Sequence, residues 1–263
     1  MTAFNTMPLT ESPPLPAVAS LCLCAGRQML ETGANGRTVH EGIADIARAL
    51  ACDRSEVLCQ HQAILVTLHR GSESFIQMSK TGEHGVNLRR TQAIRQIIRD
   101  LIAKKIDCCA AQSAADLVPA NTPAYPVWLV CLATGLACSA FGKLLGADWS
   151  AFLPILAGSA GGQWLRHTLL RRRHNVFVVA SIISFLSAFL AGLGARLCGS
   201  AHDSVATVAA TLLLVPGVAV LNAQVDVLEG KPNLAAARAL RVLYLLMFMA
   251  LGLALAQTLI LPH

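Results

Sequence analysis

Charged residues are scarce in this sequence. Only 14% of its 263 residues are Asp, Glu, Lys or Arg, whereas an ordinary soluble domain carries about 25%. Aromatic residues are few as well, at 5%, while hydrophobic residues make up 54%. A chain with so little charge is not expected to be soluble along its whole length. Part of it is therefore predicted to lie in a membrane.

The shortage of charge is concentrated in the second half of the chain. Residues 1–125 contain 12 Lys and Arg and 11 Asp and Glu, whereas residues 126–263 contain 9 and 4. The net charge of +6 therefore comes mainly from the apolar half. Basic residues beside apolar stretches are typical of orientation in a bilayer rather than of nucleic-acid binding. We expect a soluble N-terminal domain, a C-terminal transmembrane domain in the lipid bilayer, and no nucleic-acid partner.

Several functional motifs are also missing. Residues 1–20 lack the basic start of a signal peptide, and prolines interrupt any apolar core there, so the N-terminal domain is expected in the cytoplasm. The nine cysteines show no paired CxxC spacing, which favours small buried thiols over a metal site. No phosphate-binding loop, nucleophile elbow or HExxH sequence occurs. We therefore predict no enzyme activity, no cofactor and no metal.

Two other function classes stay open as alternatives. One is a membrane-anchored hydrolase that uses the soluble domain, and the other is a membrane sensor or scaffold. A hydrolase needs a nucleophile next to a base, and the sequence does not show such a pair. Hydrogen-bonded or surface side chains are the expected role of its titratable candidates, which are Glu31, His40, Glu41, His61, His69, Glu83 and His84.

The soluble part is predicted to be a small α+β domain over residues 16–117. A disordered leader is expected before it at residues 1–15, and a proline-rich linker after it at residues 118–126. Apolar periodicity and turn residues predict elements in the order ααββα. These elements are helices at 16–32 and 38–51, a hairpin of 63–69 with 74–79, and a helix at 88–105.

The boundaries of the first two helices carry capping signals. Gly33 follows the first helix, as glycine often does at a helix end. Thr38 is expected to cap the second helix, with Glu41 three residues later as its capping-box partner.

Residues 127–263 are read as the transmembrane domain. A membrane-spanning helix needs about 20 apolar residues. The second apolar stretch is the shortest, although Trp149 and Trp164 lie at its ends as interfacial anchors do. The sequence predicts an α-helical membrane protein with about five transmembrane helices, at about 127–145, 149–165, 175–196, 204–225 and 240–261.

The charges between these spans predict the orientation. With a cytoplasmic N-terminus, the inner loops at 166–174 and 226–241 contain seven Lys and Arg. The outer loops contain only Lys143 and Arg196. This bias follows the positive-inside rule, and five spans would place the C-terminus in the periplasm. We expect a multi-pass protein of the bacterial inner (cytoplasmic) membrane.

The fourth predicted span contains the strongest candidates for a transport site. Proline and glycine at Pro216 and Gly217 should kink or break this helix, and broken helices expose polar backbone to substrates in transporters. Asn222 and Asp226 follow and share one helical face. We expect these four residues to line a substrate or coupling-ion pathway, with Asp226 accepting a coupling proton or cation. The alternative is a packing kink with Asp226 as an ordinary interfacial residue.

The second predicted span contains Gly158 and Gly162, which form a GxxxG face suited to close helix packing. Exposed backbone along a pathway is the alternative for this segment. Gln163, which follows directly, is a further candidate for the pathway.

Several blocks of this sequence resemble the threonine/serine exporter family over residues 17–258. The most specific is Leu-Leu-Leu-Val-Pro-Gly at 212–217 with Asn222, Asp226 and Gly230. One difference is Ala-Asn-Gly-Arg at 34–37, where many members carry acidic or hydroxyl residues. The other matching blocks are Glu31-Thr32-Gly33-Ala34 leading into Val39-His40-Glu41, Ala63-Ile64-Leu65-Val66-Thr67, Gly85-Val86-Asn87-Leu88 and Pro126-Val127-Trp128-Leu129.

The resemblance implies a function and a partner. Full-length members add a second hydrophobic half, whereas this chain has five predicted spans, so it resembles the larger subunit of the split, two-component branch. That branch works with a small hydrophobic membrane protein, and an enterobacterial pair of this type is implicated in succinate export. The expected function is secondary export of small carboxylates, with threonine and serine as the alternative substrates. A homo-oligomer is left open.

Overall fold

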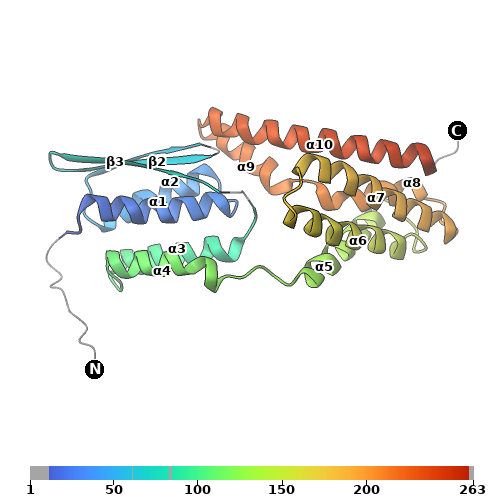
Figure 1. Ribbon diagram of the computed structural model, residues 1–263, viewed down its shortest axis with the longest axis horizontal. Helices are drawn as coiled ribbons and strands as arrows, with labels where there is room; N and C mark the ends of the chain where they lie inside the picture. The colour runs from blue at the N-terminus through green and yellow to red at the C-terminus, as the bar shows by residue number, and fades with distance from the viewer. Residues whose placement is uncertain (1–11, 61, 83–84, 261–263) are drawn as a thin grey trace, which may run out of the picture. The chain divides into compact units, whose positions relative to one another are not determined.

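The computed structural model describes residues 12–60, 62–82 and 85–260, which are mostly helical with one small sheet (Figure 1). Most of the predicted leader, as well as His61, Glu83 and His84, lies outside the described residues. The chain divides into two compact units. The first unit combines residues up to 123 with residues 218–238, and the second combines residues 124–217 with residues from 239 onward.

The first unit begins with elements in the order ααβββαα. The predicted helices and the hairpin are found, whereas the first strand and the fourth helix were not predicted. The elements are α1 (Leu15–Glu31), α2 (Gly36–Ala49), β1 (Arg54–Cys59), β2 (Ala63–Arg70), β3 (Glu73–Lys80), α3 (Leu88–Ile102) and α4 (Cys108–Asn121).

Both unpredicted elements have weak sequence signals. Strand β1 is only six residues long, and none of its side chains is fully buried. Helix α4 is rich in alanine and cysteine and carries Pro119 in its last turn, where a proline usually marks a helix end. It nevertheless extends to Asn121, which is four residues into the segment predicted as a linker.

The sheet is antiparallel in the order β1-β2-β3. Strand β2 alternates as a half-buried strand should, with Ile64, Val66 and Leu68 fully buried. Helix α1 lies between the sheet and the α3–α4 pair (Figure 1). That position explains why α1 is apolar on nearly every side, since it contributes to the core in two directions.

Helix α2 is held at both of its ends. The predicted cap was wrong, because the helix begins at Gly36 and the Asn35 side chain caps it by accepting from the Thr38 amide at 2.8 Å. The turn at Gly33, which has a φ of +89°, brings the chain into the helix three residues earlier than expected. At the other end, Arg70 donates to the Leu50 carbonyl at 2.7 Å.

The second unit and the remaining helices carry the apolar stretches. Among the residues that the structure describes, three helices, α5, α7 and α10, are long and apolar enough to cross a membrane, and the interrupted pair α8–α9 makes a fourth if it counts as one span. Helix α6 does not meet this criterion. The elements are α5 (Val127–Leu144), α6 (Phe152–Arg171), α7 (Val176–Leu197), α8 (Asp203–Thr211), the 3-10 helix η1 (Leu212–Leu214), α9 (Gly217–Leu228) and α10 (Pro232–Ile260).

The last helix is longer than the sequence predicted. It was expected to begin near residue 240, after a charged loop, but α10 begins at Pro232. Proline is well tolerated in the first turn of a helix, where its missing N–H would have no partner. The loop before α10 shrinks to residues 229–231. Arg238 is therefore a helical residue, one turn and a half inside α10.

Candidate functional site

The helix break expected at Pro216 is present in the structure. Helix α8 passes into η1, Val215 adopts an extended conformation, and α9 starts at Gly217. Val215 is 46% exposed, and a Cβ built on Gly217 would meet no atom within 4 Å. The boundary between the two compact units also falls here, between Gly217 and Val218.

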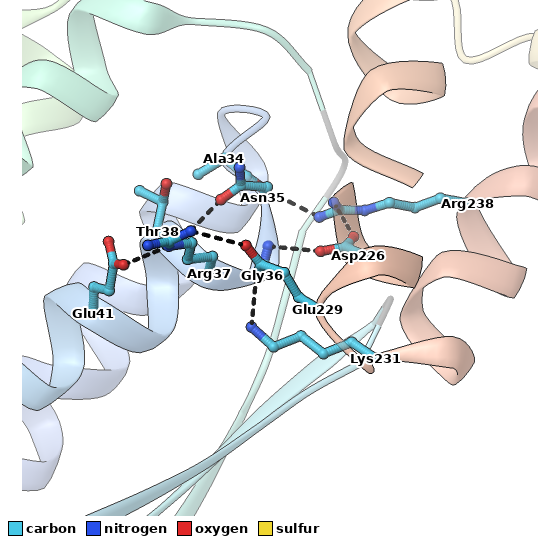
Figure 2. Close-up of polar contacts among 10 residues, drawn as sticks. All are labelled: Ala34, Asn35, Gly36, Arg37, Thr38, Glu41, Asp226, Glu229, Lys231 and Arg238. Carbon is cyan, nitrogen blue, oxygen red and sulfur yellow. Dashed lines mark hydrogen bonds and ion pairs between the residues drawn. The ribbon is translucent and has the colours of Figure 1, made fainter. Parts of the chain in front are cut away.

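Asp226 is the most deeply buried acidic residue near the end of α9. Its exposed fraction is 0%, and both of its carboxylate oxygens have partners within the first unit (Figure 2). Oδ1 accepts from the Gly36 amide at 2.9 Å, and Oδ2 accepts from Arg238 Nη1 at 2.6 Å. A buried guanidinium therefore faces the carboxylate.

Arg238 connects two parts of the chain that are distant in sequence. Its side chain is 7% exposed, and it reaches Asp226 across the α9–α10 turn. Its Nη2 donates to the Ala34 carbonyl at 3.1 Å (Figure 2). A buried guanidinium with both a carboxylate and a carbonyl as acceptors is compensated, whereas a single buried charge would be strongly destabilising.

Gly36 places the Asp226 carboxylate at the N-terminus of α2. The first amides of a helix lack partners inside the helix, and the helix dipole favours negative charge there. Asn35 takes the Thr38 amide, and Asp226 takes that of Gly36. A Cβ at position 36 would lie 2.9 Å from Asp226 Oδ1, so this approach requires glycine.

Asn222 contacts the same α1–α2 turn. Its side-chain nitrogen donates to the Gly33 carbonyl at 2.8 Å. Asn222 and Asp226 therefore both bind the backbone of residues 33–36, one turn apart on α9. We call residues 33–36 together with the side chains of Asn222, Asp226 and Arg238 the turn contact.

A second carboxylate lies next to the turn contact. Glu229 follows Asp226 by three residues and is held between Arg37 Nη1 at 3.6 Å and Lys231 Nζ at 3.7 Å (Figure 2). Arg37 also pairs with Glu41, through Nε at 2.6 Å. The Arg37 guanidinium lowers the pKa of the Glu41 carboxyl, mainly through this hydrogen bond. Arg37 in the first turn of α2 thus lies between two carboxylates, that of Glu41 on the same helix and that of Glu229 in the turn after α9.

Two further titratable groups lie close to these charges. Burial, aided by the Lys231 ammonium, lowers the pKa of His40, so its imidazole is neutral at pH 7. Burial raises the pKa of the Cys59 thiol to about 11. A thiol that stays protonated at neutral pH is a poor nucleophile.

The candidates on α6 lie in the second unit. A Cβ on Gly158 would lie 2.8 Å from the Ser187 carbonyl of α7, and one on Gly162 would overlap the Ser187 hydroxyl. These two glycines face α7 at very close range. Gln163 is partly buried and accepts from Arg166 Nη1 at 3.5 Å.

Sequence reasoning selected Asn222 and Asp226 but missed their partners. Arg238 was assigned to a loop, and the signal that could have found it was the 3.6-residue periodicity continuing back to Pro232. Glu229 and Arg37 were not considered for the site. The contact between Gly36 and Asp226 joins residues 190 positions apart, which no local pattern can indicate.

Comparison with known proteins agrees with these features. A family model described as "Putative threonine/serine exporter" matches residues 20–260. A "Probable succinate transporter subunit YjjP" of Klebsiella aerogenes is 28% identical over 92% of this chain and 93% of its own length. The protein of the same name from Escherichia coli K12 is 27% identical over 84% of this chain and 86% of its own length. No solved structure matches the chain. The chain belongs to the threonine/serine exporter family.

Proposed function

We propose that this chain is the larger subunit of a two-component inner-membrane exporter of small dicarboxylates of the succinate type. Membership of an exporter family supports the transport function. The name of the two relatives, "Probable succinate transporter subunit YjjP", supports the substrate class and the need for a partner. The partner we propose is a small hydrophobic membrane protein.

The observation that carries this proposal is the turn contact. Asp226 and Asn222 follow the break at Pro216 and bind the α1–α2 turn of the soluble part, while Arg238 at the start of α10 closes the contact. Such a contact has two states, bound and released. Release of Asp226 would free α9 from residues 33–36 and expose a carboxylate that can take up a coupling proton or cation.

The helix break supports the need for a partner. Pro216 has no backbone donor, so the helical ladder is incomplete at this point. The amides of Val215 and Gly217 bond to the carbonyls of Leu212 and Val215 at 3.1 and 3.0 Å, which partly makes up for the missing helical bonds. Val215 and Gly217 are nevertheless exposed on this chain, and polar backbone at a helix break in a membrane has to be covered by protein or line a water-filled path. A second protein would provide that cover. The purified chain reconstituted alone should therefore show little flux.

The proposed orientation has the N-terminus in the cytoplasm and the C-terminus in the periplasm, with α6 as a fifth crossing. Cys198 follows α7 and is exposed, and Cys109 at the start of α4 is exposed as well. A membrane-impermeant maleimide should label Cys198 in intact cells and Cys109 only after lysis. Serine variants at each position identify the signals, and the reverse pattern would contradict this orientation.

The test of function is export from cells that hold this chain and its partner. Asp226→Asn keeps the side-chain shape but removes the charge that Arg238 and the α2 N-terminus hold. The Arg238 guanidinium then lacks its anion, which should lower the stability of the variant, so export is compared per amount of protein in the membrane, and on that basis we expect export of succinate to be lost. Asp45→Asn, which alters an exposed carboxylate paired with Arg48 on α2, is the matched control and should export normally. Normal export by Asp226→Asn would remove Asp226 from the site.

Threonine and serine are the alternative substrates because the family carries their name. To decide between the two substrate classes, the same cells are loaded with a threonine-containing dipeptide, and the export of threonine is measured beside that of succinate. Export of threonine without export of succinate would replace the substrate class and leave the exporter function in place.

A further inference from the structure

Two carboxylates of this chain, Asp226 and Glu229, lie on cationic positions around the start of α2. Asp226 is held by the Gly36 amide and Arg238, at 2.9 and 2.6 Å. Glu229 is held by Arg37 and Lys231, at 3.6 and 3.7 Å. Figure 2 shows both carboxylates pointing toward residues 36 and 37 from the same side.

The groups that hold these side chains are those that recognise carboxylate ligands. Guanidinium groups bind carboxylates with short, charge-assisted hydrogen bonds, and the N-terminus of a helix adds a backbone donor and a favourable dipole. Arg238 is 6% exposed, so its charge cannot be left to water and requires an anion. The structure therefore contains a built carboxylate site whose present occupant is part of the chain.

We propose that the Gly36 amide, Arg37, Lys231 and Arg238 form a receptor for a small dicarboxylate, and that Asp226 and Glu229 occupy it when no ligand is bound. This inference rests on the proposed function and names the residues that recognise the substrate. Two cationic positions favour a ligand with two carboxylates over one with a single carboxylate. Asp226 lies in the last turn of α9 and Glu229 directly follows the helix, so one movement of the end of α9 would shift both carboxylates.

Competition within the chain sets the expected affinities. A tethered carboxylate competes at a high effective concentration, in the millimolar range or above. The unaltered chain should therefore bind a dicarboxylate weakly and release it when Asp226 returns. Removing the competing charges should tighten binding and hinder release. This explains how Asp226→Asn can abolish export by the protein that remains in the membrane.

The test is titration of the purified full-length chain in detergent with succinate. The variant Asp226→Asn/Glu229→Gln should bind succinate at least tenfold more tightly than the unaltered chain. Propionate, with one carboxylate, should bind more weakly than succinate, and the uncharged succinamide should not bind. Asp45→Asn, the matched control on α2, should leave the affinity unchanged.

A further substitution tests the receptor side. Adding Arg238→Met to the double variant should remove the gain in succinate affinity, because the buried guanidinium is lost. The melting temperature reports whether each variant is folded. If the double variant does not fold, Glu229→Gln alone, which alters a partly exposed side chain, should still tighten binding by a smaller factor.

The inference is overturned if a folded variant binds succinate no better than the unaltered chain, or if succinate and succinamide bind alike. It is also overturned if Arg238→Met has no effect on binding. The proposed function is tested by a different outcome. Tight succinate binding by the variant with no export from intact cells would retain the receptor and reject the exporter, whereas export without binding would retain the exporter and reject the receptor.

Discussion

In the second unit, helices meet through glycine, alanine and hydroxyl side chains, whereas in the first unit α9 meets the α1–α2 turn through charge. Gly158 and Gly162 bring α6 against α7 at close range. Ser184 of α7 donates to the Met249 carbonyl of α10 at 2.7 Å. Such contacts depend on shape and are typical of membrane helices. These contacts contain no charged group whose partner a dissolved ion could replace.

The turn contact differs because its strongest bonds involve a full charge on each side. Asp226 and Arg238 are both buried, and the carboxylate also receives the Gly36 amide. A competing anion can take the place of the carboxylate on the same donors. The turn contact of the first unit can therefore respond to a charged ligand, whereas the contacts of α6 and α7 in the second unit respond to changes in side-chain volume.

The largest effect is expected from separating the buried pair. Arg238→Met leaves the Asp226 carboxylate buried without its cation, which should lower the free energy of unfolding by about 3–5 kcal/mol. Asp226→Asn/Arg238→Met should recover most of this loss, since the amide oxygen can still accept from Gly36. Denaturant titration in detergent measures both. Equal stability of Arg238→Met and the unaltered chain would show that the pair is not buried as described.

The next effect concerns shape packing in the second unit. Gly162→Ala adds a Cβ that overlaps the Ser187 hydroxyl, and overpacking of this kind should cost about 1–3 kcal/mol. Gly161→Ala is the matched control, because a Cβ there meets no atom within 4 Å. The two adjacent variants are compared by their melting temperatures in detergent. Similar melting temperatures for both variants would contradict the close packing of Gly162 against α7.

A smaller effect is expected at Asn222. Asn222→Ala removes the hydrogen bond to the Gly33 carbonyl, which should cost about 1 kcal/mol. Gln224, which is exposed on the same helix, is the control, and Gln224→Ala should change stability by less than about 0.5 kcal/mol. Hydrogen exchange at residues 33–36 reports the local loosening. Unchanged exchange in Asn222→Ala would mean that charge alone holds the turn.

The smallest effect is expected at a carboxylate of the second unit that has a purely structural role. Asp148 accepts from Ser200 Oγ at 2.5 Å and from the Ala201 amide at 3.1 Å, and these bonds, that of Ser200 first, lower its pKa from 3.8 to about 2. The stabilising contribution is therefore present above about pH 3.8 and is lost as the pH falls toward 2. Melting temperatures of the unaltered chain and Asp148→Asn should converge over this range. A constant difference would contradict this assignment.

The sequence predicted those elements that local periodicity specifies. The hairpin of β2 and β3 alternates strongly, and α1 and α3 carry apolar stripes that only a helix aligns. The cap of α2 was misplaced because Asn35 and Thr38 are both capping residues, three positions apart, and the choice depends on where the turn at Gly33 ends. Strand β1 was missed because its alternation is short and no side chain is fully buried.

The candidate site was predictable only in part. The break at Pro216 and the shared face of Asn222 and Asp226 follow from helix geometry alone. The partners of Asp226 lie 12 and 190 positions away. Their meeting depends on tertiary packing that no sequence period encodes. Arg238 was also hidden by the positive-inside rule, which counts a basic residue without asking what it binds.

Gly36 has a consequence for how this protein and its relatives vary. Any other residue at this position would place its Cβ 2.9 Å from the Asp226 carboxylate, so position 36 cannot change while position 226 keeps its side chain and α9 its place. A substitution at position 36 is therefore tied by epistasis to position 226, because it is tolerated only where the side chain at 226 is shortened or moved. In an alignment of the threonine/serine exporter family, positions 36 and 226 should vary together despite their separation of 190 residues.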